Sequence, residues 1–331
     1  MIEVENASKF YGAFEAVKDL SFSVGSEQVL GFLGPNGAGK TTVMKMLTGF
    51  HFPARGKVKI DGISVEEDPL EIKKRIGYLP ENNPLYGDMS PDEYLSFIAS
   101  VRLIPKTKRK KALDGAISAC GLEEVRRRRI ETLSKGYKQR LGLAQAIIHD
   151  PDILILDEPT SGLDPNQIIE IRSLVRELGK RKTVILSTHI LQEVEAVCST
   201  VLILNEGRIA AQGTSDEIAL TLKGRGEDTW ELLIKAALGD KNSIDFPVLP
   251  SFEGRESGKP YIENEGNGIV KLRFNVAQGT GDSSADGELI FDWAVSQGYK
   301  IIGMNRKKPS LEDIFVKLTN EPLPVLENRY E

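Results

Sequence analysis

Residues 29–42 read Val-Leu-Gly-Phe-Leu-Gly-Pro-Asn-Gly-Ala-Gly-Lys-Thr-Thr. The run at 29–33 has the length and apolar composition of a strand buried on both faces, and residues 41–47 have a helical pattern. Between them, residues 34–41 match the spacing G-x-x-x-x-G-K-[ST]. A strand, a glycine loop and a helix in this order predict an anion site on a parallel α/β sheet.

The glycine loop predicts a phosphate-binding site. Glycines permit positive φ and let backbone N–H groups surround phosphate oxygens, and the following helix adds the positive end of its dipole. We expect Lys40 to reach the outer phosphates and the Thr41 hydroxyl to bind Mg²⁺. The alternative, a glycine turn before a helix, is disfavoured by the flanking strand and helix. The expected site comprises Gly34, Pro35, Asn36, Gly37, Ala38, Gly39, Lys40, Thr41 and Thr42.

A second apolar run, at 153–156, ends in two adjacent carboxylates, Asp157 and Glu158. Unpaired charge at the end of a buried strand is costly, and a bound metal ion removes that cost. We expect Asp157 to lie in the Mg²⁺ shell. Glu158 points the other way along the strand and is placed to polarise an attacking water. Taken alone, such a pair is as often a helix cap or a turn.

Strand and helix patterns alternate up to about residue 220, which predicts an α/β fold with a largely parallel, helix-covered sheet. Alternating runs at 2–4, 20–24 and 58–60 predict an additional antiparallel portion. A helical insertion is expected at about 82–150. Its first helix, capped by Ser90, places Tyr94, Phe97, Ile98 and Val101 on one face.

Beyond about residue 222 the composition changes, with glycine-rich or polar stretches at 224–228, 254–268 and 279–287. We therefore expect domains at 1–221 and 222–331, the second a small α+β unit. Its expected elements are strands at 268–274 and 299–304 and helices at 288–297 and 310–318.

Residues 133–140 read Leu-Ser-Lys-Gly-Tyr-Lys-Gln-Arg and lie upstream of the carboxylate strand. Together with the glycine loop, they make residues 1–220 resemble the nucleotide-binding subunits of ATP-binding cassette (ABC) transporters, a P-loop NTPase fold whose signature is L-S-G-G-Q-x-Q-R. The resemblance implies that Ser134 and the Gly136 backbone contact the γ-phosphate of an ATP held by the opposite subunit. Lys135 and Tyr137 depart from the signature. Lys135 either adds a charge to this cradle or points to solvent.

Other positions match the family one by one. By resemblance, Tyr11 stacks on adenine, residues 161–164 form a loop that crosses the dimer interface, and His189 contacts the γ-phosphate. Glu81 stands where the family typically has a glutamine, and we expect it still to reach the Mg²⁺ shell. His51 and His149 have no comparable placement and are assigned no role.

Residues 80–86 and 309–315 narrow the resemblance to the ABC-2-type export branch, most like the gliding-motility and multidrug-export ATPases. This implies a homodimer that closes on two Mg-ATP and powers a separately encoded ABC-2-type permease. The permease is expected to dock on residues 82–97, where Leu85, Tyr86 and Met89 are candidate exposed contacts; the alternative is that they pack internally. The expected location is cytoplasmic, held at the inner face of the cell membrane through the permease.

Composition limits the competing functions. The 331 residues include 40% hydrophobic side chains and carry a net charge of −5, which provides no general field for nucleic acid. The basic runs at 106–111 and 126–129 are either solvated faces or local binding patches. No apolar run approaches the ~18 residues of a membrane span. The two cysteines, Cys120 and Cys198, are expected to be small buried hydrophobes.

Two other functions remain as alternatives. The first is a soluble ABC ATPase acting on nucleic acid or ribosomes, which usually has two cassettes in one chain or a long coiled coil between the motifs. The second is a regulatory nucleotide-binding module without turnover. It is disfavoured by the presence of Lys40, Asp157, Glu158 and His189.

Overall fold

The computed structural model describes residues 1–215, 217–218, 227–235, 261–266, 269–277, 283–307 and 315. They belong to two compact units, Met1–Ser215 and Asp216–Lys317, and each is described by itself. In the parts of the chain that are described, no helix is both long and apolar enough to cross a membrane.

The first unit is built on a six-stranded sheet with the order β10-β9-β3-β8-β7-β6. Every neighbouring pair is parallel except β9 and β10. All five residues of β3 and of β7 are buried, as expected for strands covered on both faces. The strands are β3 (Val29–Leu33), β6 (Ile76–Leu79), β7 (Ile153–Asp157), β8 (Thr183–Thr188), β9 (Thr200–Asn205) and β10 (Arg208–Gly213).

A second, antiparallel sheet has the order β2-β1-β4-β5 and confirms the expected antiparallel portion. Its strands are β1 (Ile2–Tyr11), β2 (Phe14–Val24), β4 (Arg55–Ile60) and β5 (Ile63–Ser64). Helix α1 (Lys40–Leu47) joins one hydrophobic core with side chains of both sheets. This packing fixes the helix that begins at the glycine loop.

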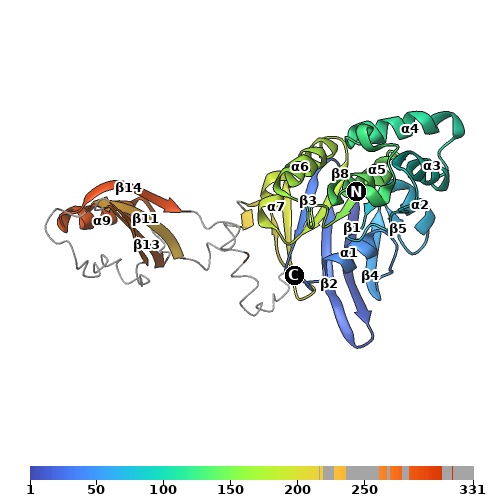
Figure 1. Cartoon of the computed structure of the whole chain (residues 1–331). Coiled ribbons are helices and arrows are strands. Elements are labelled where there is room, and N and C mark those ends of the chain that lie inside the picture. The colour runs from blue at the N-terminus through green and yellow to red at the C-terminus, as the bar shows by residue number, and fades with distance from the viewer. Residues whose placement is uncertain are drawn as a thin grey trace. The chain divides into compact units, whose positions relative to one another are not determined.

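A second core lies between the large sheet and helices α3 to α7. Figure 1 shows α3, α4 and α5 as one cluster, with α4 on its outer side. The close approach of α5 to the sheet depends on Gly77 in β6, where a Cβ atom would lie 2.1 Å from the Ala146 carbonyl oxygen. The helices are α2 (Pro69–Arg75), α3 (Pro91–Val101), α4 (Lys106–Ala119), α5 (Lys135–Ile147), α6 (Pro165–Gly179) and α7 (Leu191–Val197).

Helix α3 begins with the expected cap, in which the Ser90 hydroxyl accepts from the backbone N–H of Glu93. The four expected residues do lie on one side of this helix, but that side is only partly buried. Tyr94 is buried and Ile98 half-buried, but Phe97 and Val101 are 41% and 61% exposed. At 100° per residue the buried stripe runs through 94, 95, 98 and 99, and the other two side chains lie beside it.

The expectation that both cysteines are buried is confirmed for Cys120 only. Cys120 is buried and Cys198 half-buried, and both are free thiols packed with the second core. Burial raises the pKa of each thiol to about 12. Both therefore stay protonated at neutral pH.

The second unit is a four-stranded antiparallel sheet, β12-β13-β11-β14. Helix α9 contributes Ile290, Trp293 and Ala294 to a core with apolar side chains of the sheet. The elements are β11 (Glu227–Lys235), β12 (Tyr261–Gly266), β13 (Ile269–Ala277), α9 (Ser283–Ser296) and β14 (Lys300–Lys307).

Two expectations about this unit need correction. The polar stretch 254–268 contains strand β12, an edge strand of which Ile262 packs against the core, so a polar sequence suffices there. Strand β11, at the centre of the sheet, was not expected. The predicted helix at 310–318 lies outside the described residues except for residue 315.

Candidate nucleotide-binding site

The glycine loop connects β3 to α1 and requires glycine at several positions. Gly37 and Gly39 have φ values of +82° and +103°. A Cβ atom on Gly39 would lie 2.6 Å from the Ala16 carbonyl oxygen, and one on Gly34 would lie 2.4 Å from that of Leu204. The loop is thus pressed against β2 and β9, with no room for side chains there.

Lys40 is held inside the bend of its own loop. Its ammonium group donates to the carbonyl oxygens of Gly34 (2.8 Å) and Pro35 (3.2 Å). The ammonium group also lies 3.5 Å from Glu158 Oε1. Lys40 and Glu158 are each only 7% exposed. A buried cation at a helix N-terminus, surrounded by loop backbone, is suited to bind an oligophosphate.

Asp157 ends β7 with its side chain completely buried. Its Oδ1 accepts from the Thr41 hydroxyl (3.4 Å) and from the Ser187 hydroxyl. Its Oδ2 is buried and has no hydrogen-bond partner among the described residues. Burial raises the pKa of Asp157, opposed by these two hydroxyl contacts. An orphaned carboxylate oxygen beside a threonine hydroxyl matches the chemistry of a cation site.

The protein side chains would supply only part of a metal shell here. Over the described ranges, no group of three or more His, Cys, Asp or Glu side chains is arranged to hold a metal ion. Mg²⁺ normally keeps several waters and binds through one or two carboxylates together with substrate phosphates. The Asp157 and Thr41 pair therefore fits Mg²⁺ that arrives with a nucleotide better than a protein-only metal site.

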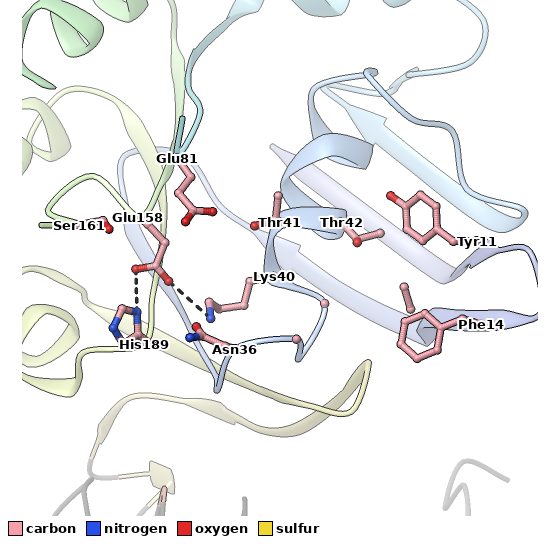
Figure 2. Close-up of a pocket in the computed structure, with 13 residues that line it drawn as sticks. Tyr11, Phe14, Asn36, Lys40, Thr41, Thr42, Glu81, Glu158, Ser161 and His189 are labelled. Carbon is pink, nitrogen blue, oxygen red and sulfur yellow. Dashed lines mark hydrogen bonds and ion pairs between the residues drawn. The ribbon is translucent and has the colours of Figure 1, made fainter. Parts of the chain in front are cut away.

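Glu158 lies between Lys40 and His189, as Figure 2 shows. Its backbone is left-handed, with φ +48°, and its N–H lies 3.1 Å from both the carbonyl and hydroxyl oxygens of Ser187. Its Oε2 lies 2.9 Å from Nδ1 of His189, a half-exposed side chain that follows β8. A positive φ at a non-glycine residue is strained, and such strain is concentrated at functional sites.

The resulting pocket has a volume of about 510 Å³. Ten of the predicted residues line it, namely Tyr11, Asn36, Gly37, Gly39, Lys40, Thr41, Thr42, Glu81, Glu158 and His189. Gly34, Pro35, Ala38 and Asp157 do not line it, but the carbonyls of Gly34 and Pro35 accept from Lys40, and Asp157 accepts from Thr41. Tyr11 lies at the opposite end from Glu158 and His189 (Figure 2). The pocket therefore has an aromatic end and a charged end.

Sequence reasoning missed three lining residues: Phe14, Ala16 and Ser161. Phe14 is 63% exposed and lies beside Tyr11 at the pocket end (Figure 2). A usable signal was present, since an aromatic residue directly after the Gly12 turn, at the start of β2, has no core to fill. Ser161 belongs to the loop expected at the dimer interface, and it also faces this chain's own pocket.

Ser134 and Gly136 do not line this pocket. They line a second one, of about 300 Å³, together with residues at the start of α6 such as Asp164 and Gln167. The Ser134 hydroxyl caps α5 by accepting from the Tyr137 N–H (3.4 Å). A Cβ atom on Gly136 would lie 2.5 Å from the Gln167 side chain. The predicted phosphate contacts of one chain are therefore divided between two separate pockets.

Lys135 is exposed, in line with the expectation that it points to solvent, but its end also approaches its own chain. A Cβ atom on Gly162 would lie 2.0 Å from its Nζ, so the side chain lies over the 161–164 turn. Glu81 is exposed and lines the first pocket, and its charge contributes to the raised pKa of Asp157. Of the unassigned histidines, His51 packs edge-on against Tyr11 at 5.8 Å, and His149 Nε2 lies 3.1 Å from the Ile76 carbonyl oxygen.

The glycine loop lies between a central parallel strand and a helix, and carboxylates end a nearby strand. This arrangement defines a P-loop nucleoside triphosphatase. Comparison with known proteins specifies the family. Residues 17–161 match the family described as ABC transporter. The ABC transporter ATP-binding protein YxlF of Bacillus subtilis (strain 168) is 34% identical over 325 residues, covering 97% of this chain and 100% of YxlF.

Two further comparisons agree. The bacitracin transport ATP-binding protein BcrA of Bacillus licheniformis is 33% identical over 322 residues, covering 96% of this chain and 97% of BcrA. A solved ATP-binding subunit of an ABC transporter has a TM-score of 0.62 at 31% identity, covering 68% of this chain and 95% of its own. This chain belongs to the ATP-binding subunits of ABC transporters. It hydrolyses ATP to power a membrane permease, which confirms the predicted family, fold class and activity.

Proposed function

We propose that two copies of this chain bind head to tail and enclose two ATP molecules. Each ATP is held by the glycine loop of one copy and by Ser134 and Gly136 of the other. The observation that carries this proposal is the separation of the two pockets, because Ser134 and Gly136 line none of the cavity that holds Lys40 and Glu158. ATP drives closure because it binds the closed dimer better than the open one, and hydrolysis removes that difference.

A mixing experiment tests this arrangement. A Lys40→Ala chain and a Ser134→Ala chain should each hydrolyse ATP poorly. In a mixed dimer, however, the intact glycine loop of the second chain meets the intact Ser134 of the first. ATPase activity should therefore recover on mixing. Mixed dimers that form but stay as inactive as the parents would contradict the shared site.

Within each site we propose distinct roles for the predicted residues. Glu158 polarises the attacking water, Lys40 and His189 stabilise charge on the γ-phosphate, and Tyr11 stacks on the base. Support comes from the position of the Glu158 carboxylate, whose two oxygens contact Lys40 and His189. Such contacts hold the carboxylate in one orientation at the phosphate end of the pocket.

We further propose that Asp157, Thr41 and Glu81 hold Mg²⁺ bound with ATP, whose role is to neutralise charge on the phosphates. The buried, unpartnered Asp157 Oδ2 supports this assignment. The charge of Glu81 beside a triphosphate is tolerable only close to the cation. A Glu81→Gln chain should show a changed Mg²⁺ dependence of ATPase activity. An unchanged rate and Mg²⁺ dependence would remove Glu81 from this role.

The proposed partner is a separately encoded ABC-2-type permease that exports its cargo, with this chain at the inner face of the membrane. The naming of BcrA as a bacitracin transport protein supports a transport role over the nucleic-acid alternative. Of the three expected docking residues, Leu85 and Met89 are half-buried and pack against the second core, whereas Tyr86 is 49% exposed. Its ring contacts those of Tyr94 (6.2 Å) and Phe97 (5.7 Å). The docking surface we propose is therefore Tyr86 with Phe97.

Purification with a co-expressed candidate permease tests the partner. An integral membrane protein should copurify with the wild-type chain, and less of it with a Phe97→Ser chain. Copurification of RNA in place of a membrane protein would favour the alternative function.

We also propose that residues 222–331 form an accessory α+β domain. The second compact unit, Asp216–Lys317, begins close to this boundary.

A further inference from the structure

The turn that connects α3 to α4 departs from the usual preferences of a helix end. Leu103 is the first residue after the cap of α3 and adopts the left-handed conformation, with φ +57°. The turn is closed by hydrogen bonds from Leu103 N–H to the Ser100 carbonyl (3.1 Å) and from Ile104 N–H to the Ala99 carbonyl (3.0 Å). Glycine usually occupies this position because a Cβ atom is disfavoured there.

The side chain of Leu103 gains nothing from the fold that would offset this strain. The residue is 80% exposed, the highest value among the exposed large hydrophobic residues of the described ranges. Val101, two residues earlier, is 61% exposed. An apolar residue that is both strained and solvated departs from local rules twice, and such departures are concentrated at functional positions.

The helix that follows is equally unusual. Lys106, Lys108, Lys110 and Lys111 lie in the first two turns of α4, and all four are exposed. The first turn contains no acidic residue, and Pro105 provides no side-chain cap. Cations at a helix N-terminus oppose the helix dipole, which favours anions there. Among the described residues, no carboxylate forms an ion pair with these four lysines.

The other basic run of this region, residues 126–129, differs in having acidic partners. Arg126 lies 3.0 Å from carboxylate oxygens of both Asp92 and Asp114, and Arg129 lies 3.1 Å from Glu131. These contacts give two of its four arginines acidic partners within the protein. Among the described residues, the arginine run is therefore paired in part, whereas none of the four lysines of α4 has an internal counter-charge.

We propose that Val101, Leu103, Lys106, Lys108, Lys110 and Lys111 form a membrane-contacting tip that binds the surface of a bilayer rich in anionic phospholipid. Anionic headgroups neutralise the lysines and the helix dipole, and the two aliphatic side chains enter the interfacial layer. A single partner, the bilayer, thus removes the exposed leucine from water and supplies counter-charges to the lysines. The tip provides direct lipid contact, which goes beyond a membrane location reached only through a permease.

A nucleic acid is the competing anionic partner, but it fits the tip less well. Phosphates could satisfy the lysines, yet single-stranded nucleic acid is bound by aromatic side chains on which bases stack. The tip presents valine and leucine, which suit hydrocarbon. Phosphatidylglycerol vesicles and an RNA of mixed sequence therefore separate the two partners.

The test is flotation of the full-length chain with vesicles of phosphatidylcholine alone or mixed equally with phosphatidylglycerol. The wild-type chain should float with the mixed vesicles only, and added salt should weaken this binding. Lys106→Gln with Lys108→Gln should lower the affinity about 30-fold, from roughly 1 kcal/mol for each lysine removed. The ATPase rate measured without vesicles should not change, because none of these residues lines the nucleotide pocket.

The matched control is Arg127→Gln with Arg128→Gln. These exposed arginines carry the same total charge and adjoin Arg126, whose carbonyl accepts from the Asp92 N–H at the opposite end of α3. Eleven helical residues separate the two ends by roughly 16 Å. This control should bind mixed vesicles within about twofold of wild type.

Leu103→Gly gives the sharpest readout because its two expected effects have opposite signs. Glycine relieves the left-handed strain, so the thermal midpoint should rise, while vesicle binding should weaken several-fold. The proposal is overturned if wild type ignores anionic vesicles, if RNA binds where vesicles do not, or if the arginine control loses as much binding as the lysine variant. It is also overturned if Leu103→Gly binds vesicles as well as wild type.

Discussion

Glu158 Oε2 and His189 Nδ1 lie 2.9 Å apart, although 31 positions separate these residues in the chain. Glu158 follows the last residue of β7 and His189 the last residue of β8, which are adjacent parallel strands. Lys40 begins the helix after β3, the neighbour of β8 on the other side. Because the carboxyl ends of parallel strands meet at one sheet edge, the three groups converge without any long-range adjustment.

Glu158→Gln should lower kcat by about 100-fold or more while ATP still binds. The amide keeps the size of the side chain but cannot act as a base toward water. Phosphate release measures the rate, and fluorescence of a labelled nucleotide measures the affinity. A variant that hydrolyses ATP at the normal rate would remove Glu158 from the role of general base.

Phe14→Ala should raise KM for ATP about 3- to 10-fold with little effect on kcat, as should Tyr11→Ala. Both rings line the pocket at the end away from Glu158, so we expect them to contact the base and not the phosphates. Phe52→Ala is the matched control, since Phe52 is 42% exposed but lies outside the pocket lining. Equal KM values for Phe14→Ala and this control would exclude Phe14 from base binding.

The parts of the site that local chemistry dictates could be predicted from the sequence. The glycine loop follows one buried strand and the two carboxylates end another. Because the carboxyl ends of parallel strands meet at one edge of a sheet, these motifs had to lie close together. Phe14 had a sequence signal in its place after the Gly12 turn, but the contact of Lys135 with Gly162 could not be predicted, because it depends on how two helix starts approach each other in space. Helix α3 shows the same limit, since apolar spacing alone did not reveal that Phe97 lies off its buried stripe.

Gly77→Ala and Gly115→Ala should change stability in opposite directions. A Cβ on Gly77 would meet the Ala146 backbone carbonyl at 2.1 Å, so the variant should lose about 2 kcal/mol or more of unfolding free energy. At Gly115 in α4, nothing lies within 4 Å of the added atom, and alanine should stabilise by about 0.4–1 kcal/mol. Urea unfolding measures both. A Gly77→Ala variant as stable as wild type would show that α5 does not lie this close to β6.

Stability should fall on acidification because of His149. Burial, together with the nearby Arg102 charge, lowers its pKa from 6.5 to about 4. Between these values the unfolded chain binds a proton that the folded chain does not. The free energy of unfolding should therefore drop by roughly 2 to 3 kcal/mol as pH falls from about 6.5 to 4, with the full contribution present above 6.5.

His149→Gln isolates this contribution, because glutamine can also donate to the Ile76 carbonyl but does not titrate. Urea unfolding at several pH values should give a flatter dependence for this variant in that window. Identical curves for variant and wild type would assign the acid sensitivity to other groups.

The molar mass of the full-length Glu158→Gln chain, measured by light scattering with and without Mg-ATP, tests the shared nucleotide site most directly. We expect the mass to double when Mg-ATP is added, and to return to that of a single chain when Ser134→Arg is introduced as well. A Glu158→Gln chain that remains a single copy at high concentration with saturating Mg-ATP would contradict a nucleotide held between two copies.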